Sequence, residues 1–216
     1  MVDKPIELML ALSGNRRGPL ALLFALDAQL ARIVATTREP MMGQLRLAWW
    51  RDSLVALDTS PAPAEPILRD IADRLLPMGI RGADLAGMTE GWESILASDG
   101  ADGAVRAVYA DRRGSLLFAA AARVMGADGT GVAAAARGWA LADLSRRSSL
   151  ANVAMLARVE AIENMQAGIA EYWPAAIRPL GTLAMLAIRD IGEAYSGWGR
   201  IGDAYSFLKF NMTGRR

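Results

Sequence analysis

The sequence contains neither cysteine nor histidine among its 216 residues. These absences exclude disulfides, Cys/His zinc sites, thiol nucleophiles and every serine–histidine triad. Any metal would have to be a hard cation such as magnesium, held by carboxylates. Lysine is almost absent as well, because only Lys4 and Lys209 are present among 24 basic residues. The basic side chains are therefore nearly all arginine, whose planar fork suits phosphate and carboxylate.

The chain also lacks a strong net charge and long apolar runs. The formal charge is +1, which argues against a nucleic-acid partner. The longest stretches without a charged residue, Ser148–Ala157 and Pro179–Ile188, are ten residues each, against roughly 20 for a membrane-spanning helix. The N-terminus has no signal-peptide pattern. We expect a cytoplasmic protein without a transmembrane segment, and peripheral contact with a membrane stays open.

Alanine and leucine dominate the chain and alternating β-branched runs are missing, which predicts an all-α fold. Glycine and proline punctuation places helices at about 18–37, 41–57, 66–76, 82–97, 104–125, 130–161, 174–195 and 200–210. The helix 104–125 is expected to break or bend near Gly114. The proline-rich stretch Thr59–Pro66 is interpreted as a loop, since the segment before it is too short for a core of its own. We therefore expect one domain over residues 1–216.

The most distinctive string of the chain is Arg38–Leu54, which reads REPMMGQLRLAWWRDSL. It resembles an early helical segment of the squalene/phytoene synthase family, most of all its bacterial branch and the related mitochondrial complex I assembly-factor branch. Weaker likenesses to the same family lie at Leu22–Val34, Val108–Gly126, Gly138–Leu144 and Trp173–Tyr195. The resemblance implies a compact helical bundle of the trans-isoprenoid synthase type.

The resemblance also implies a chemistry, the head-to-head joining of two prenyl diphosphates. In active members two Asp-x-x-x-Asp motifs face each other across an apolar cavity. Residues at i and i+4 share a helix face, so each motif directs two carboxylates at one spot, where magnesium bridges them to the diphosphate.

Neither motif is present here. Where the first is expected, Asp27 is followed four residues later by Ala31, and where the second is expected, Asp143 is followed by Arg147. The only acidic pair at this spacing is Asp3 and Glu7, near the N-terminus. A cation beside Asp143 would repel a metal ion. Asp27 and Asp143 are thus the candidate catalytic residues, and no metal site is predicted.

Several other polar residues could hold a diphosphate without metal. The candidates are Arg46, Arg51, Tyr109, Arg112, Arg113, Arg146 and Arg147. The simpler interpretation is that these arginines lie at helix ends and form surface ion pairs. The pairs Glu90/Glu93 and Glu160/Glu163 could each share a helix face, and if all four converged they would offer another carboxylate site.

Two hypotheses of different classes follow. In the first, the chain is a non-catalytic binding or assembly-type protein that keeps the fold and a lipid-sized cavity, takes a prenyl diphosphate or other lipid-like ligand or a protein partner, and needs no cofactor. In the second, it is an active prenyl diphosphate transferase with an atypical site built from the arginine doublets or the Glu-x-x-Glu pairs, and magnesium would be its cofactor. We favour the first because both metal motifs are lost.

Overall fold

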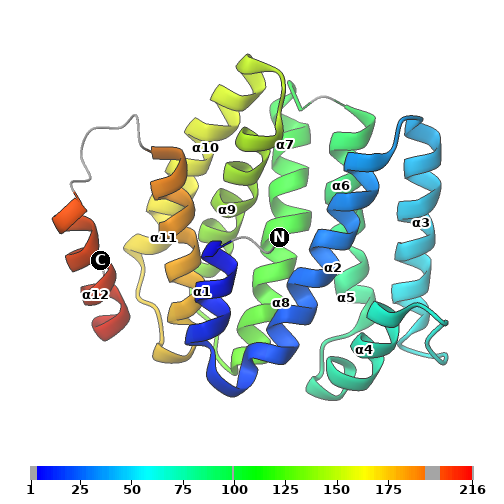
Figure 1. Ribbon diagram of the computed structural model, residues 1–216, viewed down its shortest axis with the longest axis horizontal. Coiled ribbons are helices and arrows are strands. Elements are labelled where there is room, and N and C mark those ends of the chain that lie inside the picture. The colour runs from blue at the N-terminus through cyan, green and yellow to red at the C-terminus, as the bar shows by residue number, and fades with distance from the viewer. Residues whose placement is uncertain (1–3, 99, 193–199, 216) are drawn as a thin grey trace.

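The computed structural model describes residues 4–98, 100–192 and 200–215, and these residues form helices and connecting loops without a strand. The α-helices are α1 Lys4–Leu12, α2 Arg17–Thr36, α3 Pro40–Ala56, α4 Pro66–Arg74, α5 Gly82–Ala86, α6 Met88–Ala97, α7 Gly103–Tyr109, α8 Leu116–Met125, α9 Val132–Arg147, α10 Ala151–Ala170, α11 Arg178–Gly192 and α12 Arg200–Thr213 (Figure 1). Short helical turns are η1 Gly14–Arg16, η2 Leu76–Met78, η3 Ala110–Ser115 and η4 Ala175–Ile177. The all-α prediction is confirmed.

Two predicted helices are each divided in the structure. The helix expected at 82–97 is interrupted at Gly87, which separates α5 from α6. The prediction of one continuous helix at 130–161 was wrong. The chain becomes extended at Ser148 and a second helix begins at Ala151. Serine hydroxyls compete for backbone hydrogen bonds, and the Leu150 amide here donates to Ser148 Oγ at 3.2 Å. This break ends α9 next to Arg146 and Arg147.

Helix α9 lies at the centre of the bundle and packs against α10, α11 and η3 (Figure 1). The α9–α10 contact is close because small residues face each other. A side chain at Gly138 would collide with Met165, and one at Gly168 would collide with the backbone of Ala135. Backbone approach of this kind fixes the register of two helices, since any larger residue would separate them.

Helix α2 passes across the bundle with its apolar side buried against α8, α4 and α6. The segment Gly14–Thr36 is long and apolar enough to cross a membrane by length and composition alone, and it is the one such helix among the residues the structure describes. Half of its apolar window is buried inside the fold, and Asp27 at its middle is 5% exposed. We interpret α2 as a core helix that carries one buried charge.

The proline-rich segment forms a loop between α3 and α4, and polar side chains at both of its ends tie it to the bundle. The Asp58 carboxylate accepts hydrogen bonds from the Gly82 and Ala83 amides, at 2.6 and 3.0 Å, at the start of α5. Glu65 caps α4 by accepting from the Leu68 amide at 3.0 Å. Leu68 is fully buried in the same hydrophobic core as α2, so α4 packs on the bundle.

Candidate functional site

The two solitary aspartates predicted from the sequence meet at a single buried arginine. Arg113, on η3, donates from Nε and Nη2 to the two carboxylate oxygens of Asp27 on α2, both at 2.9 Å. Its third nitrogen, Nη1, donates to Asp143 Oδ2 on α9 at 2.5 Å. The residues are 5% (Asp27), 2% (Arg113) and 8% (Asp143) exposed. One guanidinium thus bridges the two acidic groups inside the core.

Aromatic rings enclose this guanidinium. Its central carbon lies 4.3 Å from the centre of the Trp92 ring and 4.7 Å from that of Trp139. Such contacts stabilise a desolvated cation through the negative face of the ring. Trp92 also donates its indole N–H to Asp27 Oδ1 at 3.1 Å, and the Tyr109 hydroxyl accepts from Arg113. The space between the two aspartates is therefore filled by side chains.

Two further arginines lie on the Asp143 side of the cluster. Arg147, one helical turn after Asp143, donates from Nε to Asp143 Oδ2 at 2.7 Å. Arg146 approaches the other carboxylate oxygen at 3.7 Å. Their side chains are 48% and 36% exposed, so they connect the buried pair with solvent. Three arginines against two aspartates leave an excess of positive charge, which opposes a divalent cation at this place.

The pKa directions agree with this arrangement. Burial disfavours the charged form of Asp143, but the charges of Arg113 and Arg147 outweigh it and hold the pKa of Asp143 below its ordinary value. Burial likewise lowers the pKa of Arg113, yet the carboxylate of Asp27 and the other groups around it more than compensate and raise that pKa overall. Burial raises the pKa of Tyr109, so its hydroxyl stays protonated. The cluster is a network of buried and half-buried ion pairs that also contains a neutral tyrosine.

Local sequence explains why Arg113 points inward. Residues Ala110–Ser115 form a π-helical turn inside what would otherwise be a continuous helix from α7 to α8. Gly114 of this turn lies against the backbone of Ala136 on α9, and Gly91 of α6 lies against the backbone of Arg113. These two glycines let three elements approach closely around the arginine. π-Helical turns of this kind often occur at functional sites.

The structure separates the other predicted anion-binding residues. Arg112 faces away from Arg113 and pairs with Glu90 at 3.0 Å on the surface. Arg51 lies 3.3 Å from Asp52 and 3.8 Å from Glu93. Arg46 lines a groove between α2 and α3. The structure thus brings together Asp27, Tyr109, Arg113, Asp143, Arg146 and Arg147, and places Arg46, Arg51 and Arg112 elsewhere.

The alternative carboxylate site does not form among the described residues. Glu160 is bound by Arg106 of α7, with Nη2–Oε1 at 2.6 Å, while Glu90 and Glu93 take the surface partners given above. Within residues 4–98, 100–192 and 200–215, no group of three or more acidic side chains could hold a metal ion. Asp3, of the Asp3/Glu7 pair, lies outside the described residues.

Two residues of the site, and one buried arginine outside it, were not expected from the sequence. Trp92 and Trp139, which flank the guanidinium, were not singled out as site residues, although Trp139 stands in the string that precedes Asp143. Arg106, 5% exposed, was also missed; it binds Glu160 and the carbonyl of Gly100 at 2.8 Å. A buried arginine cannot be told from a surface one by residue type, so only the apolar residues around it offered a signal.

The structure is an all-helical bundle of the kind that trans-isoprenoid synthases form, with one aspartate on each of two core helices bound to the same arginine. Comparison with protein-family models supports this, because the squalene/phytoene synthase model matches residues 8–158. That range is well over half of the chain and contains every member of the Arg113 cluster. The chain belongs to the squalene/phytoene synthase family. Searches of curated proteins and of solved structures return no significant match.

Proposed function

We propose that this chain is a non-catalytic member of its family, a binding or assembly-type protein in which a buried arginine replaces the metal-bound diphosphate. The single observation that carries the proposal is the bridge from Arg113 to both Asp27 and Asp143. Both oxygens of Asp27 and Oδ2 of Asp143 already accept hydrogen bonds from cationic groups. Magnesium would need those same oxygens as ligands.

Displacing the arginine would be costly. Removing one partner from a buried ion pair typically costs about 3–5 kcal/mol, since an uncompensated charge is left in the core. A metal ion that displaced Arg113 would have to gain more binding free energy than this, with at most two protein carboxylates as ligands. In addition, Arg147 occupies the position where the second motif would have its second acid. The proposed protein binds a prenyl diphosphate or other lipid-like ligand, or a protein partner, and needs no cofactor. Its proposed location is the cytoplasm or the surface of a membrane.

One observation favours the alternative, an active transferase with an atypical site. Arg146 and Arg147 are partly exposed and their cluster carries excess positive charge, so they could bind a diphosphate from the solvent side. In that case the arginines would stabilise the leaving diphosphate, with or without magnesium. The lipid-sized cavity that either hypothesis uses stays a prediction, because the space between Asp27 and Asp143 is occupied by Arg113 and its aromatic neighbours.

Pyrophosphate release distinguishes the two functions. We expect the purified protein, shown to be folded and helical by circular dichroism, to release no pyrophosphate from farnesyl or geranylgeranyl diphosphate, with or without magnesium. The variant Arg147→Gln serves as a matched control, because the atypical site would lose activity with it. Turnover that requires magnesium, or turnover of the wild type that Arg147→Gln abolishes, would contradict the non-catalytic function.

A further inference from the structure

The outward face of α3 is apolar over its first three turns. Met41, Met42, Leu45 and Trp49 are 72%, 45%, 59% and 48% exposed. Their spacing puts them on one side of the helix, while Leu47, Trp50 and Leu54 on the other side are buried in the core. A helix that is apolar on both sides is expected to be buried on both sides. In the part of the chain that the structure describes, α3 is covered on one side only.

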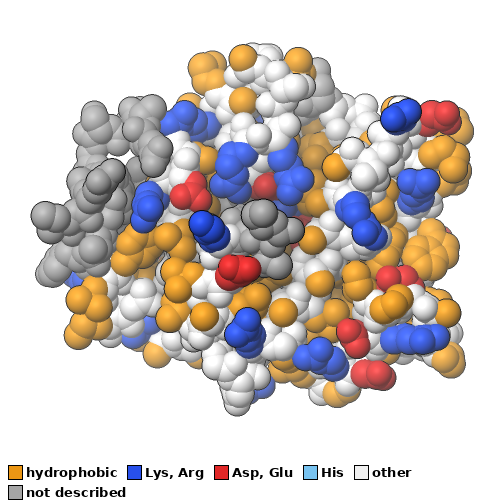
Figure 2. Space-filling model, in the orientation of Figure 1, with side chains coloured by type: hydrophobic (Ala, Val, Ile, Leu, Met, Phe, Trp, Pro, Cys, Tyr) orange, Lys and Arg blue, Asp and Glu red, His pale blue; other side chains and the backbone are white. Residues whose placement is uncertain are grey.

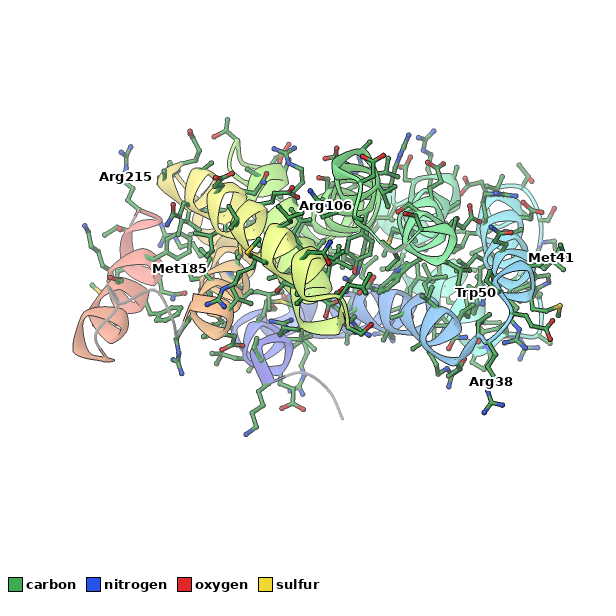
Figure 3. The ribbon with its side chains drawn as sticks, turned by 90° about the horizontal axis from the view of Figure 1, so that it is seen from above. Arg38, Met41, Trp50, Arg106, Met185 and Arg215 are labelled. Atoms are coloured by element: carbon green, nitrogen blue, oxygen red, sulfur yellow. The ribbon has the colours of Figure 1, made fainter. Side chains whose placement is uncertain are left out.

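This face lies at an edge of the molecule. Figure 3 shows Met41 and Arg38 at the outer end of the bundle, with Trp50 on the inner side of α3. Hydrophobic side chains gather at this edge in the space-filling view, next to Lys and Arg side chains and a few Asp and Glu side chains (Figure 2). A contiguous exposed apolar patch on a soluble fold generally marks a surface that binds a partner or a membrane.

A groove of about 300 Å³ runs beside this face between α2 and α3. Its lining residues are Gln29, Arg32, Ile33, Thr36, Arg46, Trp49 and Trp50, which include two arginines and no carboxylate. Arg32 donates to Gln29 Oε1 at 2.5 Å. Among residues 4–98, 100–192 and 200–215, neither Arg32 on α2 nor Arg46 on α3 forms an ion pair. Arg51, also on α3, is close to Asp52 and Glu93. The groove therefore presents two uncompensated cations beside a tryptophan ring.

The charges around the apolar face favour a partner with a negatively charged surface. Arg32, Arg38 and Arg46 lie around the first half of α3, where Glu39 is the nearest acid in sequence. Glu90 and Glu93 of α6 line a second groove beside Met41 and Leu45, but they pair with Arg112 and Arg51, and Asp52 is also close to Arg51. A matching surface must offer negative groups directly beside an apolar layer. An anionic phospholipid bilayer offers both, with phosphates at the surface and acyl chains beneath it. Trp49 fits the boundary between these layers, where tryptophan is enriched.

We propose that the α3 edge, defined as Met41, Met42, Leu45 and Trp49 together with Arg32 and Arg46, docks on the surface of a bilayer that contains anionic phospholipid. The apolar side chains enter the boundary between head groups and acyl chains. The two arginines bind lipid phosphates through their planar N–H groups. This docking lies outside the Arg113 cluster and does not depend on whether the protein is catalytic.

Co-sedimentation with vesicles tests the proposal. We expect the wild-type protein to bind phosphatidylcholine vesicles that contain phosphatidylglycerol and not vesicles of phosphatidylcholine alone. Replacing both arginines, Arg32→Gln with Arg46→Gln, should weaken binding about 25-fold, because each basic residue near an anionic surface contributes roughly fivefold. Leu45→Ser should weaken it about tenfold through the loss of buried apolar surface.

Matched controls keep the test specific to α3. Met155→Ser on α10 changes a side chain with 60% exposure, against 59% for Leu45, and Arg69→Gln on α4 removes an exposed arginine. Both should bind like the wild type, and circular dichroism should show all variants folded. The proposal is overturned if the wild type does not bind, binds neutral vesicles equally well, or loses no binding in the α3 variants. It is also overturned if light scattering without lipid shows a dimer that Leu45→Ser dissociates, since the face would then belong to a second copy.

Discussion

Replacing Arg113 with methionine is expected to lower the free energy of unfolding by about 3–5 kcal/mol. The substitution keeps much of the side-chain length but leaves Asp27 and Asp143 facing each other in the core, both less than a tenth exposed. Asp27 would lose its cationic partner, while Asp143 would keep Arg147 and Arg146 on the solvent side. A buried carboxylate without a cation is repelled by its acidic neighbour or takes up a proton, and both outcomes oppose folding at neutral pH. Urea denaturation followed by circular dichroism measures the loss.

The neighbouring residue provides the control. Arg112→Met removes an exposed partner of Glu90, so its effect should stay within about 0.5 kcal/mol. A further variant isolates the charge: adding Asp27→Asn and Asp143→Asn to Arg113→Met should recover part of the stability, because the uncompensated charge of Asp27 and its repulsion with Asp143 are gone. Equal effects of the two arginine substitutions, or no recovery in the triple variant, would show that Arg113 does not hold the aspartates electrostatically.

Gly114→Ala is the second substitution expected to have a large effect, about 1–3 kcal/mol of destabilisation. The added Cβ would lie far inside van der Waals contact with the carbonyl oxygen of Ala136 on α9. Backbone cannot move aside as a flexible side chain can, so η3 would be pushed away from α9. Because Arg113 precedes Gly114, the same shift would lengthen the bond from Arg113 to Asp143.

Gly103→Ala is the matched control for this prediction. Gly103 opens α7, and a Cβ there would meet only the end of the Arg106 side chain, at 3.5 Å, an ordinary contact. Alanine is the better helix former, so this variant should be neutral or slightly more stable. Thermal unfolding measures the stability of both variants relative to the wild type. A Gly114→Ala protein as stable as Gly103→Ala would mean that Gly114 does not lie against the backbone of Ala136.

Much of the fold could be predicted from local chemistry. Proline at the start of α3 and of α4 marks where those helices begin, and the apolar spacing of Leu47, Trp50 and Leu54 identifies the buried face of α3. The break between α9 and α10 could not be predicted in this way. No glycine or proline marks it, and the backbone turns at Ser148 and Ser149, whose effect depends on the helices packed around them.

The site was predictable only in part, for a physical reason. The four-residue spacing of Tyr109 and Arg113, and of Asp143 and Arg147, places each pair on one helix side, and all four were candidates. Asp143 was a candidate catalytic residue, and the other three were expected to bind diphosphate. The structure instead pairs Arg113 with Asp27, 86 positions away, and with Asp143, 30 positions away. Such contacts depend on how α2, η3 and α9 pack, which no local pattern specifies.

We propose that Arg113 occupies the place where a magnesium–diphosphate would bind between Asp27 and Asp143. A crystal structure of the protein grown with manganese and pyrophosphate, with anomalous diffraction measured for manganese, tests this most directly. We expect Arg113 to stay bound to both carboxylates and no manganese peak to lie beside Asp27 or Asp143. A manganese ion bound to either aspartate, with Arg113 displaced, would contradict it.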